Sequence, residues 1–112
     1  MAYSTPYVRR NQLVLPEAPT HFVCKVGTPA WFDWLATASS FRYYSQQFIY
    51  VGHTHYRPYE PISVRREKRR QTYLWYAYRR DHGRLHKRYV GTTAALTTAR
   101  LDEIALRLNL PD

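Results

Sequence analysis

The segment ISVRREKRRQTYLWYAYRRDHGRLHKRYV, residues 62–90, decides the predicted fold. Residues 62–68, 72–80 and 84–90 combine alternating polarity with β-branched and aromatic side chains, which is typical of strands. A short charged turn joins the first two strands, and a glycine-containing turn at 81–83 joins the second and third. The segment therefore predicts a ribbon of antiparallel strands.

The loop at 81–83 sets which side chains share a face of this ribbon. As a three-residue loop it would pair Arg80 with Arg84. The face expected to lie under a helix then holds Tyr73, Trp75, Ala77, Arg79, Leu85, Lys87 and Tyr89. The uncovered face is expected to hold Arg65, Tyr76, Tyr78, Arg80, Arg84, His86 and Arg88. A register slip of one residue would exchange the two faces.

Two helices are expected to flank the ribbon. Thr28 and Pro29 form a start signal for a helix over 29–38. Thr97 is the cap candidate of the last helix, whose apolar stripe is Leu101, Ile104, Ala105 and Leu108. The predicted fold class is therefore α+β: an antiparallel sheet of three to four strands packed on a C-terminal helix, with an additional N-terminal helix.

The chain is predicted to divide into two parts. Residues 1–20 contain three prolines and are expected to be a flexible arm. Residues 21–112 are expected to be a single α+β nucleic-acid-binding domain. Within it, 41–44 alternates like a strand, 47–51 is a candidate short strand, and 52–61 is expected to be a loop.

Composition restricts the class of partner. The chain of 112 residues has 17 Lys and Arg against 8 Asp and Glu, a formal charge of +9 and a pI near 10.0. Such a balance favours a polyanion, and 45% hydrophobic residues argue against a wholly disordered basic tail. No apolar run has transmembrane length, so we expect a cytoplasmic protein without a membrane partner.

No catalytic or metal-binding pattern stands out. Cys24 is the only cysteine, which excludes an intrachain disulfide and a zinc ribbon. His53 and His55 have no cysteine or acidic residue beside them and are interpreted as loop residues. We therefore expect no enzyme, no cofactor and no metal.

Cations interleaved with tyrosines on a sheet point to nucleic acid as the partner. The predicted contacts are Arg65, Arg66, Lys68, Arg69, Arg70, Tyr76, Tyr78, Arg80, Arg84, His86 and Arg88. The leading hypothesis is a small DNA-binding protein that lays this sheet on duplex DNA. The alternatives are a binder of single-stranded RNA or DNA that stacks bases on tyrosines, and an adaptor or homodimer that uses the aromatic face. A solvated charged face that only stabilises the sheet is a further alternative.

Residues 61–108 resemble two groups of DNA-binding modules with a three-stranded sheet and a helix. These are the N-terminal modules of phage-type integrases and the domains of Apetala-type plant transcription factors. Residues 27–108, with GTPAWFDWL (27–35), VRREK (64–68), YLWYAYRR (73–80) and LHKRYVG (85–91), look similar to a small domain in bacterial LuxR- and MalT-like regulators. The integrase likeness implies Tyr76, Tyr78, Arg80, Arg84, His86 and Arg88 as contacts in the major groove. Together the likenesses imply a bacterial protein that is regulatory or associated with a mobile element.

Overall fold

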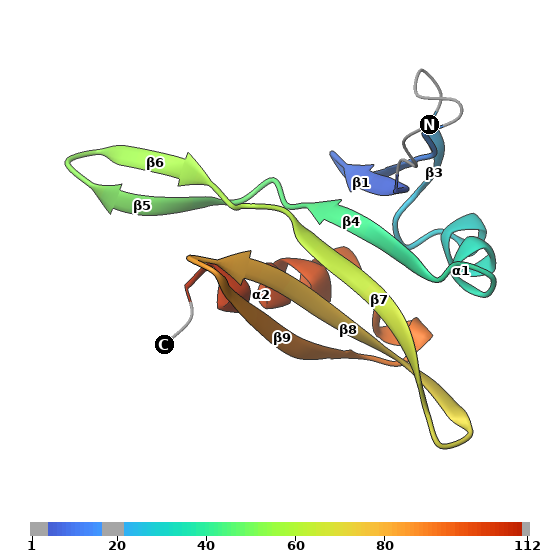
Figure 1. The fold of residues 1–112 in the computed structure, drawn as a ribbon. Helices are drawn as coiled ribbons and strands as arrows, with labels where there is room; N and C mark the ends of the chain where they lie inside the picture. Colours follow the sequence, from blue (N-terminus) through green and yellow to red (C-terminus); the bar gives the residue numbers. More distant parts are fainter. Residues whose placement is uncertain (1–4, 17–21, 111–112) are drawn as a thin grey trace.

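The computed structural model describes residues 5–16 and 22–110, which form mostly β-structure (Figure 1). The strands are β1 (Tyr7–Arg9), β2 (Gln12–Val14), β3 (Phe22–Lys25), β4 (Ser40–Tyr44), β5 (Phe48–Gly52), β6 (His55–Pro58), β7 (Ile62–Arg69), β8 (Thr72–Asp81) and β9 (Arg84–Gly91). The helices are α1 (Pro29–Leu35), the 3-10 turn η1 (Thr93–Ala95) and α2 (Thr98–Asn109).

Seven of these strands form one mixed sheet in the order β3-β2-β1-β4-β7-β8-β9. Strand β1 runs parallel to β4, and the other neighbours are antiparallel. Strands β5 and β6 form a separate two-stranded ribbon, which extends away from the sheet in Figure 1. This ribbon is called the arm below, and it is a different segment from residues 1–20.

One face of the large sheet carries the core, and its register explains which residues are buried. A row of buried side chains crosses five strands: Cys24, Leu13, Val8, Tyr43 and Ile62. A second row consists of Phe41, Val64 and Ala77. Helix α2 covers this face behind β8 and β9, with Leu101, Ile104, Ala105 and Leu108 buried as the predicted stripe requires (Figure 1).

Two tryptophans connect the helices to the sheet. Trp31 on α1 donates its indole hydrogen to the carbonyl of Leu96 at 2.8 Å, and Trp75 on β8 donates to the hydroxyl of Thr93 at 3.0 Å. The ring of Phe41 lies between them, 5.3 Å from Trp31 and 5.8 Å from Trp75. Both indoles are fully buried with their donors satisfied, so they fix the segment between β9 and α2 against the sheet.

The predicted fold class is wrong. The sheet is mixed and has seven strands, not three to four, and α1 follows three strands instead of opening the domain. Part of the range 1–20, predicted as a flexible arm, forms β1 and β2, where Val8 and Leu13 are fully buried. The segment 52–61, predicted as a loop, contains β6. The N-terminal strands escape prediction because each has only three residues, which is too short for a periodic pattern.

Replacing Trp75 by alanine should lower the free energy of unfolding by about 3–5 kcal/mol, because a fully buried indole leaves a cavity. The neighbouring Tyr73→Ala, at a position exposed on the strand, should cost less than about 1 kcal/mol. Urea unfolding of both variants gives the comparison. Equal losses would contradict the assignment of Trp75 to the centre of the core.

Candidate nucleic-acid interface

A two-residue turn sets the register of β8 and β9. Asp81 pairs with Arg84, and the turn residues His82 and Gly83 have φ of 51° and 81°. Two positive φ values are those of a type I′ turn, whose twist matches that of the flanking strands. The predicted three-residue loop, which would pair Arg80 with Arg84, is therefore wrong by one residue.

This difference of one residue exchanges the faces of the sheet on which the side chains of β9 lie. Lys87 pairs with Tyr78 and Tyr89 with Tyr76, so Lys87 and Tyr89 share the face of these tyrosines. Leu85 and Tyr89, predicted under the helix, are 56% and 48% exposed. The predicted contacts Arg84, His86 and Arg88 lie on the helix-bearing side instead.

A bulge at the end of β9 brings Gly91 opposite Trp75. Trp75 pairs with Gly91, whereas the next residue of β8, Tyr76, pairs with Tyr89. The extra residue, Val90, is buried in the core. Gly91 suits this place because its φ is +143° and an added Cβ would meet that of Ala95 at 2.7 Å.

The face of the large sheet opposite α1 and α2 is called the open face. One row across it consists of Tyr7, Arg42, Ser63, Tyr78 and Lys87, on five neighbouring strands. A second row consists of Ser40, Arg65, Tyr76 and Tyr89. Cations and tyrosines are therefore neighbours across the strands as well as along them.

Several of these cations lie over tyrosine rings. Lys87 Nζ is 4.4 Å from the ring centre of Tyr76 and 5.4 Å from that of Tyr78. The guanidinium of Arg69 is 5.0 Å from Tyr76, and that of Arg65 is 5.9 Å from Tyr78. Such pairs contribute about 0.5–1 kcal/mol each at exposed sites, so the rings hold the cations in defined positions.

Glu67 is the acidic residue within this group. Its carboxylate accepts from Arg69 and, at 3.2 Å, from Lys87. Glu67 therefore compensates part of the charge of Arg69 and Lys87. Its ion pair with Lys87 also connects β7 to β9 across β8. Exposed ion pairs of this kind contribute little to stability, which leaves both cations able to meet a ligand.

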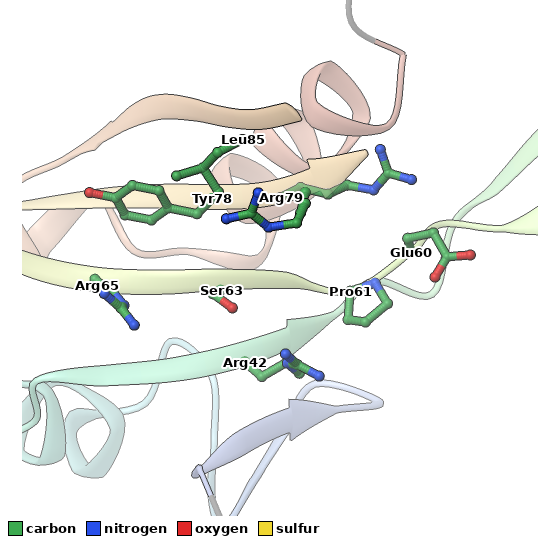
Figure 2. A pocket seen from close by; sticks show the side chains of 9 residues that line it. Arg42, Glu60, Pro61, Ser63, Arg65, Tyr78, Arg79 and Leu85 are labelled. Atoms are coloured by element: carbon green, nitrogen blue, oxygen red, sulfur yellow. The ribbon is translucent and has the colours of Figure 1, made fainter. Parts of the chain in front are cut away.

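A hollow of about 580 Å³ lies on the open face where β4, β7, β8 and β9 run side by side. Figure 2 shows Arg42 on β4, Ser63 and Arg65 on β7, and Tyr78 and Leu85 on β8 and β9. The complete lining is Arg42, Glu60, Pro61, Ser63, Arg65, Tyr78, Arg79, Arg80 and Leu85. Among the described residues, Arg42, Arg65 and Arg80 form no salt bridge, although Glu60 also borders the hollow.

The tip of the β7–β8 hairpin extends beyond its neighbours. Pairing with β4 ends at Arg65, and pairing with β9 ends at Trp75, so the tip is a free two-stranded ribbon. Figure 1 shows it projecting past β9. Arg66 is still hydrogen-bonded to the carbonyls of Ser39 and Ala36, and beyond it the ribbon carries Lys68, Arg69 and Arg70, with Glu67 as its one carboxylate.

The predicted contacts thus separate into three groups. The open face brings together Arg65, Arg69, Tyr76, Tyr78 and Arg80. The opposite face holds Arg66, Lys68, Arg84, His86 and Arg88, while Arg70 lies in the turn at φ 60°. The prediction missed Tyr7, Arg9, Arg42, Tyr44, Lys87 and Tyr89. The alternation of 41–44 was the available signal for Arg42 and Tyr44.

Three further features of the described residues concern the thiol of Cys24, metal ligation and membrane-spanning helices. Cys24 is buried, and burial raises the pKa of its thiol, which disfavours the nucleophilic thiolate. Within 5–16 and 22–110, no three His, Cys, Asp or Glu side chains form a group that could hold a metal ion. In the same residues, neither helix has the length and apolar character needed to cross a membrane.

Comparison with protein-family models, with curated proteins and with solved structures finds no match to this chain. The likenesses to regulator and integrase domains therefore stay predictions from the sequence, and the function has to be inferred from the open face itself.

Two neighbouring residues test the register. Val90→Ala should lower the free energy of unfolding by about 1–3 kcal/mol, because it removes buried methyl groups. Tyr89→Ala should cost no more than about 1 kcal/mol, because it removes an exposed cross-strand ring. Chemical denaturation measures both. The reverse order would favour the three-residue loop.

Proposed function

We propose that the protein binds duplex DNA through the open face. The observation that carries the proposal is the hollow bordered by Arg42, Arg65 and Arg80, which come from three strands and lack carboxylate partners among the described residues. Arginine binds phosphate in a planar, bidentate geometry, and Ser63 and Tyr78 add hydroxyl donors at the same place. A formal charge of +9 adds a long-range attraction for a polyanion.

The tyrosines favour duplex over single strands as the ligand of the open face. Base stacking needs a free ring face, but Tyr76 has Arg69 and Lys87 beside its ring, and Tyr78 has Arg65 and Lys87. These rings therefore act as supports that present cations to phosphates. Contacts of this type position a protein on a duplex without reading its sequence.

The free ribbon at the tip of β7 and β8 supplies a candidate for groove contact. A two-stranded ribbon fits the major groove of B-DNA, and arginine is the side chain that most often contacts guanine there. Arg69 and Arg70 lie at the end of this ribbon. We propose that the sheet lies along the backbone while this tip enters the adjacent groove.

The double variant Arg42→Ala/Arg65→Ala should weaken binding to duplex DNA by more than tenfold at moderate salt, because phosphate contacts are lost. The slope of log affinity against log salt concentration should also become shallower by about two. Fluorescence anisotropy with a labelled duplex, repeated over a salt series, measures both quantities.

Arg88→Ala is the matched control, since Arg88 is exposed on the helix-bearing side. It removes one charge and should change the affinity by less than about threefold. Unchanged binding by the double variant, or an equal loss with Arg88→Ala, would contradict the proposed surface. Single-stranded DNA and RNA competitors show in the same assay whether duplex is the preferred ligand.

A further inference from the structure

The β5–β6 arm carries the largest exposed rings of the described chain outside the open face. Phe48 and Tyr50 are each 60% exposed, and Tyr56 is 63% exposed. Tyr50 pairs with Tyr56 and Phe48 with Pro58, so the three rings share one side of the arm. The other side is covered at Ile49, which is buried. The arm therefore presents an aromatic surface that nothing in the described chain covers.

The rings of the arm differ from those of the open face in one respect. Tyr76 and Tyr78 have cations over their rings, whereas no described cation lies over Phe48, Tyr50 or Tyr56. Tyr50 and Tyr56 contact each other edge to face, with centres 5.3 Å apart and planes at 62°. Free ring faces of this kind are what nucleobases stack on.

A second hollow, of about 520 Å³, joins the arm to the open face. Phe48 and Pro58 border it from the arm, and Arg9, Arg10 and Tyr44 border it from the sheet. The guanidinium of Arg9 lies 4.2 Å from the ring centre of Tyr44, which belongs to the open face. A nucleic-acid strand that leaves the open face at this edge would therefore meet cations first and free rings next.

The base of the arm is held in place by α2. The side-chain amide of Asn109 accepts from the backbone N–H of Glu60 at 2.8 Å and donates to its carbonyl at 3.1 Å. Asn109 is buried, so these bonds are protected from water. The arm thus starts from a fixed point next to the second hollow.

We infer that the arm binds unpaired nucleobases next to the duplex, so that the preferred ligand is a duplex with a single-stranded tail. This inference rests on the proposed function of the open face. Charge decides against a second copy of the chain as the occupant. Residues 46–59 contain no carboxylate to meet the cations of a second copy, and Arg9 and Arg10 border the hollow beside the rings in a chain of net charge +9, so two copies would repel each other there.

The test compares a blunt duplex with the same duplex carrying a single-stranded thymine tail at either end. The tail should raise the affinity of the natural protein at least tenfold, because one or two stacked bases are sufficient for that gain. The variant Phe48→Thr/Tyr50→Thr/Tyr56→Thr, which keeps strand propensity, should bind the blunt duplex normally and lose the gain. A 2-aminopurine placed in the tail should be quenched by the natural protein and not by the variant.

Two control variants separate ring chemistry from general effects. Tyr50→Phe/Tyr56→Phe keeps the rings and should retain the full gain. Leu106→Ala removes an exposed apolar side chain from α2 and should also leave the gain unchanged.

The inference fails if the tail adds no affinity, or if the threonine variant keeps the gain. It also fails if the free protein sediments as a dimer that the threonine variant breaks, since the arm would then serve self-association. In these cases the proposed function still stands, provided that Arg42→Ala/Arg65→Ala weakens binding to the blunt duplex. If no duplex is bound at all, both proposals fail.

Discussion

The turn at His82 and Gly83 determines the character of both faces of the sheet. Because it contains two residues, Lys87 and Tyr89 lie beside Tyr76 and Tyr78, and Arg88 lies on the other side. Val90 follows Tyr89 and therefore lies on the core side, where it is buried, and the bulge at this residue brings Gly91 opposite Trp75. The two-residue turn thus gives β9 both the exposed Lys87 and Tyr89 on one face and the buried Val90 on the other.

One face of the sheet carries the core, and the other face carries the proposed binding surface. On the buried face the ring of Phe41 lies against both Trp31 and Trp75, and both indole donors are satisfied. On the reverse side of the same strands, tyrosine rings fix cations that would otherwise move freely in water. The core thus supplies a rigid base for a charged surface, and such preorganisation would reduce the entropy lost in the proposed binding of phosphates.

Sequence patterns predict the parts of the fold that depend on local signals. The Thr97 cap and the stripe from Leu101 to Leu108 correctly predict α2, and the alternation around Trp75 predicts β8. The N-terminal strands depend on the distant, parallel pairing of β1 with β4, and their turn uses Arg10 and Asn11 at positive φ without a glycine. For the candidate interface, Arg65, Tyr76, Tyr78 and Arg80 reach the predicted open face. Lys87 and Tyr89 were missed because one residue of loop length reverses a whole strand.

An NMR titration that follows the arginine side-chain Nε–Hε signals during addition of duplex DNA tests the central claim most directly. Arg42, Arg65 and Arg80 border one hollow on the open face, and Arg84 and Arg88 lie on the opposite side. The account predicts that the first three signals shift and that the last two stay in place. Shifts of Arg84 and Arg88, with Arg42 and Arg65 unchanged, would contradict it.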